Sequence, residues 1–323
     1  AKASGREAGH GGAAETAGAA VRVETVAPVL DRDQCLEFAV GSIAAVLGER
    51  FAEVDGFPTR VRLPDEPLML VDRVVELEGE ARSLGSGRIV TEHDVRPGAW
   101  YLDGGRIPTS IAVESGQADL MLSGYLGIDF QTRGDAVYRL LDAVVTFHDA
   151  LPEPGRTIRY DIRIERFFRQ GATWLFRFRF DGSVDGRPFL TMRDGCAGFF
   201  TERELESGRG IVRSGKLRER LGEVARQEGT STPGSLVPVE SLALDEQALD
   251  ALRDGRLEAA FGGSFAGLAV ERALTLPAGR LRLVHRVTEL DPTGGSWGLG
   301  SIRAEADIDP EDWFITCHFV DDR

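Results

Sequence analysis

Residues 108–126 read PTSIAVESGQADLMLSGYL, and residues 174–181 read WLFRFRFD. The first stretch opens with a proline and continues as a run, 111–126, whose large apolar residues recur at helical spacing. Because this run is apolar on most of its sides, we expect a buried helix there. The second stretch alternates aromatic side chains with other residues, which predicts a half-buried strand. A buried helix beside such strands indicates the α+β class, with a curved sheet wrapped round a central helix.

Further strands are predicted on both sides of the stretch at 174–181, and they cover residues 61–77, 88–92, 137–147, 158–165 and 189–200. The dipeptide Asp185-Gly186 is a hairpin signal before the last of these strands. The strands from 137 onward are expected to follow one another as an antiparallel meander. Near the N-terminus, Asp31 or Asp33 can cap a helix that ends near Gly48.

The composition bounds the class of protein. The chain has 323 residues, enough for two ordinary domains, and its 28% charged and 42% hydrophobic shares are typical of a globular protein. It contains no run of about 18 apolar residues and no signal-peptide pattern, so the sequence predicts no membrane span. The formal net charge of −14 argues against a nucleic-acid partner, since phosphate binding needs clustered lysines and arginines.

Three cysteines, Cys35, Cys196 and Cys317, are odd in number and widely spaced. They indicate a reducing, cytoplasmic compartment rather than a disulfide framework, and they lack the spacing of zinc ligands, so no metal site is predicted. The chain begins at Ala1 without a methionine and ends within an apolar motif. We interpret it as a segment of a longer polypeptide.

Part of the sequence recurs near the C-terminus. At an offset of 214 residues, Asp31, Gly41, Gly48 and Phe51 match Asp245, Gly255, Gly262 and Phe265. After a one-residue deletion the offset is 213, and the matching pairs include Leu63 and Leu276, Arg73 and Arg286, Glu92 and Glu305, Asp94 and Asp307, and Trp100 and Trp313. So many identities at one period predict a duplicated domain, which is a single-chain version of a two-fold dimer.

The repeat divides the chain into four parts. We expect a disordered linker over 1–30, a first copy over 31–205, a linker over 206–244 with one helix at 217–226, and the start of a second copy over 245–323. On this interpretation the second copy stops before its own central helix. The copies also differ in one chemically important place, because His318 falls opposite Gly105.

Residues 312–322, DWFITCHFVDD, resemble the active-site motif of hot-dog-fold 3-hydroxyacyl-carrier-protein dehydratases, Trp-Phe-x-x-Cys-His-Phe with an acidic residue shortly after. In that family a Met-Pro-Gly element opens the central helix, which carries an acidic residue six positions after the proline. Ile107-Pro108-Thr109 resembles this element, and Glu114 stands six residues after Pro108. Over about residues 31–323 the layout resembles the tandem dehydratase region of bacterial polyunsaturated fatty acid synthases, megasynthases related to polyketide synthases.

The resemblance implies a hot-dog fold, duplicated as a double hot dog with a truncated second copy. It implies dehydration of 3-hydroxyacyl thioesters to trans-2-enoyl thioesters, and some relatives also isomerise the new double bond. The site residues that it implies are His318 as base, Glu114 as acid, and Thr109, Gln117 and Cys317 beside the substrate. Thr109 stands where the family usually has glycine. The mirror-related site, with Gly105 in place of histidine, is expected to be inactive.

The resemblance also implies partners. No cofactor is expected, because the acyl group is carried on the phosphopantetheine arm of an acyl carrier protein. The partners are then that carrier protein and the other domains of a parent synthase. The two copies would form a pseudo-dimer within the chain, and a higher homodimer is compatible with this arrangement.

Eliminating water requires a base and an acid. The thioester acidifies C2, and a neutral imidazole with a pKa of about 6.5 can take that proton near pH 7. Hydroxide leaves poorly from C3, so a carboxyl whose pKa is raised by burial must protonate it. The apolar helix around Glu114 would supply that burial. Backbone N–H groups at the start of a central helix could hydrogen-bond the thioester carbonyl.

Each assignment has a structural alternative. His318 could be a satisfied core histidine and Glu114 could pair with an arginine. Gln117 could bond only the backbone, and Cys317 is more often packed than reactive. An ordinary polar sheet face or a surface for an acidic carrier protein would both account for the strand arginines, which are Arg159, Arg163, Arg166, Arg169, Arg177 and Arg179. The alternative functions are a non-catalytic hot-dog pair that binds acyl chains or scaffolds a megasynthase, and a thioesterase on the same fold.

Overall fold

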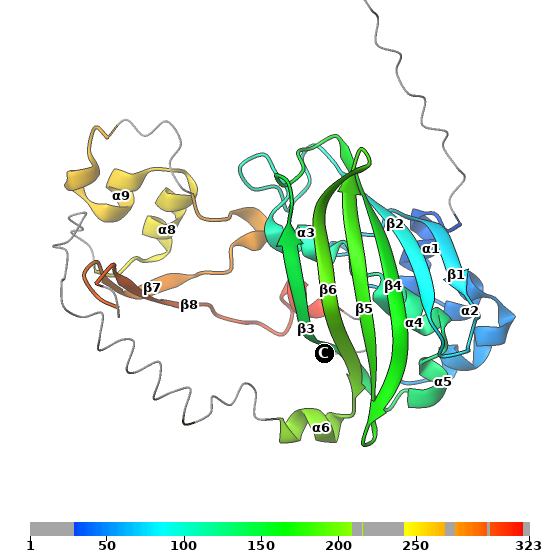
Figure 1. Ribbon diagram of the computed structural model, residues 1–323. Coiled ribbons are helices and arrows are strands. Elements are labelled where there is room, and N and C mark those ends of the chain that lie inside the picture. The colour runs from blue at the N-terminus through cyan, green and yellow to red at the C-terminus, as the bar shows by residue number, and fades with distance from the viewer. Residues whose placement is uncertain (1–28, 209–214, 216–241, 269–274, 296–297, 319–323) are drawn as a thin grey trace, which may run out of the picture.

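The structure, a computed structural model, describes residues 29–208, 215, 242–268, 275–295 and 298–318. It contains a large unit built on a six-stranded sheet and a smaller unit with a two-stranded sheet (Figure 1). The segment predicted as a helix at 217–226 lies outside the described residues, as do residues 1–28 of the predicted N-terminal linker. Val29 and Leu30 do not belong to a linker, because both donate backbone hydrogen bonds to Val74.

The strands of the large unit confirm most of the alternation seen in the sequence. They are β1 (Arg73–Gly79), β2 (Gly87–Val95), β3 (Val137–Phe147), β4 (Arg156–Gln170), β5 (Thr173–Val184) and β6 (Arg187–Phe200). All neighbours are antiparallel in the order β1-β2-β4-β5-β6-β3. The hairpin turn between β5 and β6 is confirmed, with positive φ at both Asp185 and Gly186.

Two strand predictions were wrong in part. The meander holds for β4, β5 and β6, but β3 lies at the far edge and pairs with β6 rather than with β4. Alternation identifies a strand without specifying its neighbour, so this crossover could not be anticipated. The strand predicted at 61–77 begins only at Arg73. Pro64 and Pro67 interrupt the preceding segment, and prolines lack the N–H that a ladder requires.

The predicted N-terminal helix is two helices, α1 (Arg32–Val40) and α2 (Ile43–Leu47), followed by the 3₁₀ helix η1 (Glu49–Gly56). Asp31 caps α1, as expected, by accepting a hydrogen bond of 2.9 Å from the backbone N–H of Gln34. Ser42 starts α2 by accepting a hydrogen bond from the backbone N–H of Ala45. This second cap interrupts the helix that a continuous apolar pattern had predicted.

The central helix is also broken, so the prediction of one helix over 111–126 was wrong. It consists of α3 (Thr109–Glu114) and α4 (Asp119–Tyr125), and the short α5 (Asp129–Thr132) follows. At the break the hydroxyl of Tyr160 on β4 donates a hydrogen bond of 2.6 Å to the carbonyl of Ala112 and lies 2.7 Å from the hydroxyl of Ser115. A residue of the sheet thus hydrogen-bonds a backbone carbonyl of the central helix at the break.

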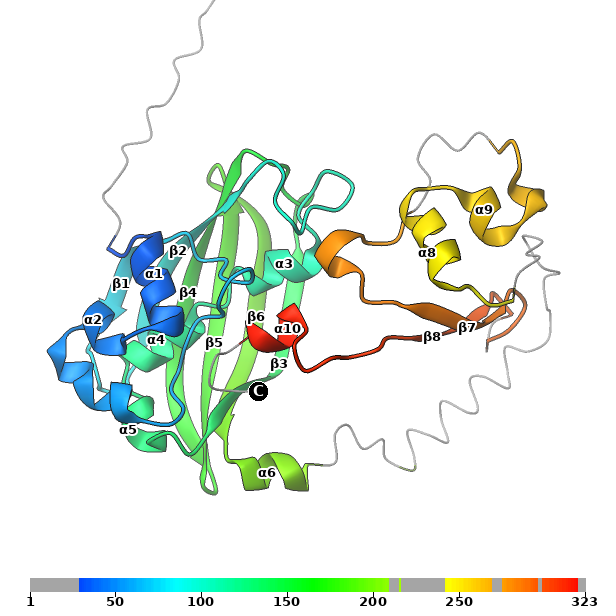
Figure 2. The same cartoon turned by 180° about the vertical axis from the view of Figure 1, so that it is seen from behind.

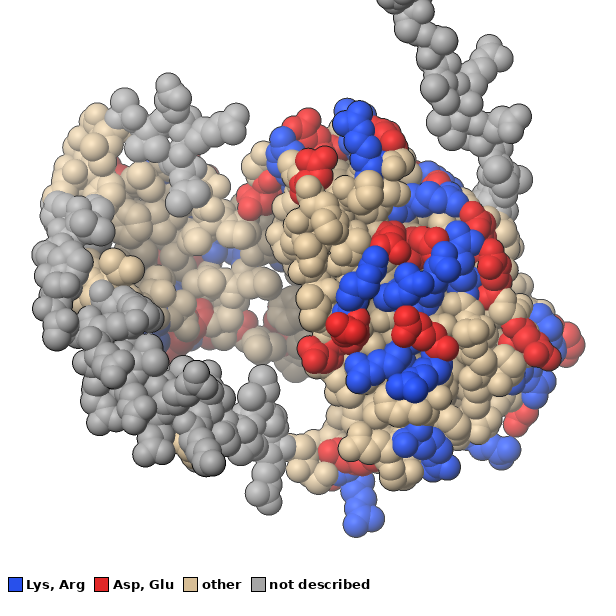
Figure 3. Space-filling model, viewed as in Figure 1, with Lys and Arg blue, Asp and Glu red and all other residues tan. Residues whose placement is uncertain are grey.

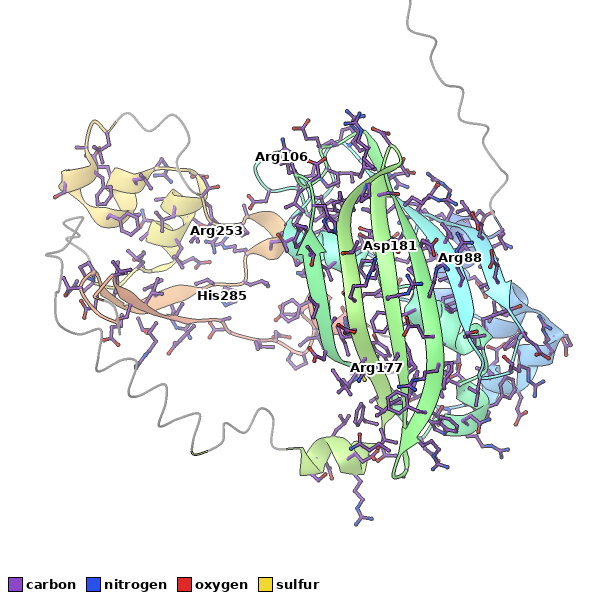
Figure 4. All side chains as sticks on the ribbon, viewed as in Figure 1. Arg88, Arg106, Arg177, Asp181, Arg253 and His285 are labelled. Carbon is purple, nitrogen blue, oxygen red and sulfur yellow. The ribbon has the colours of Figure 1, made fainter. Side chains whose placement is uncertain are left out.

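The helices cover one face of the sheet (Figure 2). The core of the large unit forms between them and the alternate residues of the central strands, which include Ile158, Tyr160, Ile162, Phe176, Phe178 and Phe180. The opposite face carries interleaved basic and acidic side chains (Figure 3). Arg88 and Asp181 project from that face (Figure 4). The central helix, which carries Glu114, lies on the helix side.

The smaller unit contains α8 (Glu246–Arg253), α9 (Leu257–Phe261), the 3₁₀ helices η2 (Gly263–Phe265) and η3 (Gly279–Leu281), β7 (Arg286–Asp291), β8 (Ser301–Glu305) and α10 (Trp313–Thr316). The helix α6 (Glu202–Ser207) follows β6 at the end of the large unit. A second, small hydrophobic core unites the two helices α8 and α9 with β7.

The described elements of the smaller unit resemble the first elements of the large unit in detail. Asp245 caps α8 as Asp31 caps α1. Arg286 pairs with Glu305 across β7 and β8, in the register that joins β1 to β2. Both hairpins have one extra residue after their second pair, Val75 in β1 and Thr288 in β7. These similarities are those expected of two copies, although the duplication itself stays a prediction.

Candidate active site

Glu114 is the last residue of α3, at the break in the central helix. Its carboxylate oxygen Oε2 accepts a hydrogen bond of 2.9 Å from the side-chain nitrogen of Gln117. Desolvation raises the pKa of Glu114 to about 7. Among the described residues no cation contributes to that shift, so the alternative in which Glu114 pairs with an arginine gains no support there. A carboxyl that desolvation keeps protonated near neutral pH can act as a general acid.

Gln117 and Thr109 differ in how close they lie to this carboxyl. Gln117 contacts Glu114 directly, so its side chain does more than bond the backbone. Thr109 is the first residue of α3 and its side chain is exposed. A role for either residue in binding substrate stays a prediction.

A second buried carboxyl lies beyond the break, at a residue that was not predicted from the sequence. Asp119 begins α4 and is 0% exposed. Its Oδ2 accepts a hydrogen bond of 3.1 Å from the hydroxyl of Tyr138 on β3. The pKa of Asp119 is raised to about 7, chiefly by burial and to a smaller extent by the charge of Glu114, although the hydrogen bond from Tyr138 lowers it. The signal was present in the sequence, since an aspartate inside an apolar helix is rarely buried without a reason.

Cys317 and His318 follow α10, which returns from the smaller unit to the helix side of the large sheet (Figure 2). The backbone N–H of Asp65 in the large unit donates a hydrogen bond of 2.7 Å to the carbonyl of Cys317. Cys317 is 3% exposed and burial raises the pKa of its thiol, as expected of a packed cysteine. His318 is exposed in a turn, which excludes a buried core histidine.

Two tryptophans join α10 to the large unit. The rings of Trp100 and Trp313 meet edge to face, with centroids 4.9 Å apart and an interplanar angle of 67°. Each indole N–H donates to a backbone carbonyl of its own unit, from Trp100 to Pro67 and from Trp313 to Arg280. These tryptophans are equivalent in the sequence repeat. The direct pairing of His318 with Glu114 stays a prediction.

The first unit has a tight turn where the second has its cysteine and histidine. Gly104 and Gly105 both have positive φ, of 55° and 79°, between the bridged residues Asp103 and Arg106. A side chain at either glycine would be strained in this conformation. The backbone therefore disfavours a catalytic histidine at Gly105, which agrees with an inactive mirror-related site.

A polar cluster near Trp100 involves another histidine, His93, which is 4% exposed. Its Nε2 lies 2.8 Å from the hydroxyl of Tyr101, and its Nδ1 lies 3.2 Å from a carboxylate oxygen of Asp72. Arg32 also donates to Asp72, at 2.5 Å. These groups line a cavity of about 270 Å³. Within it His93 is a hydrogen-bonded core histidine that supports the segment carrying Trp100.

The strand arginines fall into two groups. The guanidinium groups of three of them form ion pairs with carboxylates on the outer face of the sheet, namely Arg159, Arg163 and Arg179. The other three have no carboxylate partner among the described residues. Of these, Arg166 lies over the ring of Phe168, Arg169 lies over the ring of Trp174, and Arg177 donates to a backbone carbonyl. Figure 4 places Arg177 on the lower part of the sheet.

In the described ranges, no group of three or more histidine, cysteine, aspartate or glutamate residues is arranged to hold a metal ion. All three cysteines are free and buried. None of the helices in the described part of the chain is long and apolar enough to cross a bilayer.

Comparison with known proteins adds the family. Residues 63–193 and 276–323 match the model of the FabA-like domain, so one family model covers both units. The chain is 40% identical over 298 residues to one of the subunits of the polyunsaturated fatty acid synthase of Thraustochytrium sp.. That alignment covers 91% of this chain but only 20% of the relative's length.

Solved structures show weaker similarity. The dehydratase heterocomplex ApeI:P of Xenorhabdus doucetiae is 18% identical, with a TM-score of 0.33, over 46% of this chain and 91% of that chain. A hypothetical thioesterase with coenzyme A from Streptococcus pneumoniae is 14% identical, with a TM-score of 0.26, over 39% of this chain and 87% of that chain.

Proposed function

This chain belongs to the FabA-like domain family, and from that premise we propose that it dehydrates 3-hydroxyacyl thioesters to trans-2-enoyl thioesters during fatty-acid or polyketide-type synthesis. The 40% identical relative is part of a polyunsaturated fatty acid synthase, which supports a role within such a synthase. The substrate would then be presented by an acyl carrier protein on its phosphopantetheine arm. Three free cysteines are compatible with a cytoplasmic location.

Glu114 supplies the acid in this proposal. Its carboxyl proton is transferred to the C3 hydroxyl, the C3–O bond breaks, and water leaves. The observation that carries the proposal is the state of this carboxyl, because desolvation raises its pKa to about 7 and no cation in the described part of the chain acts on it. The hydrogen bond from Gln117 to Oε2 leaves the other oxygen available to hold and deliver the proton.

His318 supplies the base. Its neutral imidazole takes the C2 proton, the electron pair of the C2–H bond forms the C2=C3 double bond, and the histidine becomes an imidazolium. After the product leaves, solvent takes that proton and returns one to Glu114, which restores the enzyme. Trp313 and its contact with Trp100 support this role, since they hold the helix that precedes His318 against the unit that carries Glu114.

The test uses a 3-hydroxyacyl thioester of carrier protein and the full chain. We expect His318→Ala and Glu114→Gln each to lower kcat at least 100-fold, because a positioned acid or base contributes about 10²–10⁴-fold. His148→Ala and Glu165→Gln are matched controls, since both residues are exposed, His148 directly after β3 and Glu165 on β4. Wild-type turnover by both site variants would contradict the assignment of His318 as base and Glu114 as acid.

A non-catalytic pair that binds acyl chains is the second candidate. The exposure of His318 favours it, because a catalytic base normally works in a site that excludes water. A wild-type chain that binds the thioester without releasing enoyl product would support this function. Release of free acid would instead indicate a thioesterase, which would not depend on His318.

A further inference from the structure

Tyr160 is a buried tyrosine of β4 whose hydroxyl meets the central helix beside Glu114. Its side chain is 0% exposed, and a Cβ added at Gly116 would lie 2.9 Å from its ring. The hydroxyl donates a hydrogen bond of 2.6 Å to the carbonyl of Ala112 and lies 2.7 Å from the hydroxyl of Ser115. A buried hydroxyl needs polar partners, and both of these belong to the segment that carries Glu114.

The backbone hydrogen bonds explain why the broken helix needs this hydroxyl. In a continuous α-helix, the N–H of Gly116 would donate to the carbonyl of Ala112, four residues earlier. Here that N–H donates to the carbonyl of Val113 at 3.1 Å. The carbonyl of Ala112, a residue that is 0% exposed, therefore lacks its helical partner, and the hydroxyl of Tyr160 replaces it.

The same turn determines where the carboxyl of Glu114 lies. The backbone N–H of Gln117 donates to the carbonyl of Glu114 at 3.0 Å, and the side-chain nitrogen of Gln117 donates to Oε2 of Glu114 at 2.9 Å. The backbone bond spans three residues, so it belongs to the break and not to a continuous helix. Tyr160 bonds the residues two before and one after Glu114, which ties this turn to the sheet.

We propose that Tyr160 is a positioning residue for the dehydration, and that its hydroxyl stabilises the helix break that holds the carboxyl of Glu114 in place. The role rests on the proposed function, since it acts only through the acid of that reaction. Tyr160 itself exchanges no proton with the substrate. Without its hydroxyl, the carbonyl of Ala112 is buried and unpaired, and the turn that joins Glu114 to Gln117 loses its tie to the sheet.

The first test compares Tyr160→Phe with the wild-type chain in the dehydration assay. We expect kcat to fall about 10-fold or more with KM nearly unchanged, because substrate still binds but the acid is misplaced. The single hydroxyl hydrogen of Tyr160 goes to Ala112, so Ser115 donates to the tyrosine oxygen. Ser115→Ala should therefore lower kcat by less, since the bond to Ala112 remains.

The matched control is Ile162→Val, at a buried residue two positions further along β4. It removes one methyl group from the core and touches no polar group, so kcat should stay almost unchanged. If Tyr160→Phe also leaves kcat unchanged, the positioning role is wrong.

A double variant with Glu114→Gln separates positioning from a general loss of stability. A residue that acts through Glu114 has nothing left to position once the carboxyl is replaced. Tyr160→Phe should therefore cause no further loss of activity in the Glu114→Gln background. A merely structural role would lower activity by the same factor in both backgrounds, and that result would overturn the proposal.

Hydrogen exchange of the full chain tests the geometry without activity. In Tyr160→Phe, the backbone N–H groups of Gly116 and Gln117 should exchange several-fold faster than in the wild-type chain, whereas Ile162→Val should not change them. Unchanged exchange and activity in Tyr160→Phe, with an inactive Glu114→Gln, would refute the role of Tyr160 and leave the proposed dehydration standing. Full activity of Glu114→Gln would instead refute the proposed acid and, with it, any positioning of that acid.

Discussion

At the scale of single residues, Glu114 and Asp119 differ in how much of their environment could be predicted from the sequence. Glu114 could be predicted from the sequence because a motif places it six residues after Pro108. Asp119 carried a signal too, as a charge within an apolar run, but its contact with Tyr138 on a distant strand could not be predicted from a linear pattern. Both residues are charged positions within an apolar run, but only the structure shows that Glu114 is desolvated and that Asp119 contacts Tyr138.

These carboxyls make a prediction about stability and pH. In the folded state the pKa values of Glu114 and Asp119 are about 7, above the unfolded values of 4.5 and 3.8. Between the unfolded and the folded pKa values, the folded state binds more protons than the unfolded state. The free energy of unfolding therefore falls as pH rises through this range. Asp119→Asn should flatten this fall by on the order of 4 kcal/mol between pH 4 and pH 8, as measured by urea unfolding. An unchanged pH slope would contradict the prediction.

Gly105 gives a second prediction at this scale. Its φ of 79° lies in the left-handed region, and nothing lies within 4 Å of a Cβ added there. Gly105→Ala should therefore destabilise the large unit by about 1 kcal/mol through backbone strain alone. Gly56→Ala is the control, since that glycine also has open space but lacks a positive φ. Equal thermal stability of the two variants would argue against strain at Gly105.

At the scale of elements, the break between α3 and α4 positions the site. A Cβ at Gly116 would lie 2.9 Å from the rings of Phe180 and Tyr160. Gly116→Ala should thus destabilise the protein by about 1–3 kcal/mol, although alanine favours helices, because close contact with the sheet outweighs propensity. Thermal unfolding measures this effect. A stabilised variant would show that the sheet can yield and that the break is not set by packing.

The strands and the central helix show how far sequence patterns reach. Residues of β4 and β5 alternate between core and solvent, so both strands and their core-facing residues could be predicted directly from the sequence. The place of β3 beside β6 depends on a crossover, and the helix break depends on contacts with Tyr160, which is distant in sequence. Local periodicity carries no information about either. The same limit applies to the turn at Gly104 and Gly105, whose positive φ angles are seen only in the structure.

At the scale of the whole molecule, the meeting of Trp100 with Trp313 is informative. Residues on a two-fold axis meet their own equivalents, so this contact is what a pseudo-dimer of two copies would produce. An edge-to-face aromatic pair is worth about 0.5–1.5 kcal/mol. Trp100→Ala should therefore speed hydrogen exchange in α10 several-fold and lower kcat more than it raises KM, because His318 loses its position.

The control for this prediction is Trp174→Ala, at a tryptophan that contacts Arg169 on the sheet of the large unit. It should leave exchange in α10 unchanged. If both variants alter α10 equally, the effect is a general loss of stability, and the tryptophan pair does not hold the two units together.

The central claim is that His318 of one unit and Glu114 of the other act in a single elimination step. A double-variant cycle on the dehydration rate tests it most directly, using His318→Ala, Glu114→Gln and the two combined. Residues that act as a unit are strongly non-additive, so we predict that the double variant is within a few-fold of the slower single variant. Losses that multiply independently, or a double variant with wild-type turnover, would contradict the shared site.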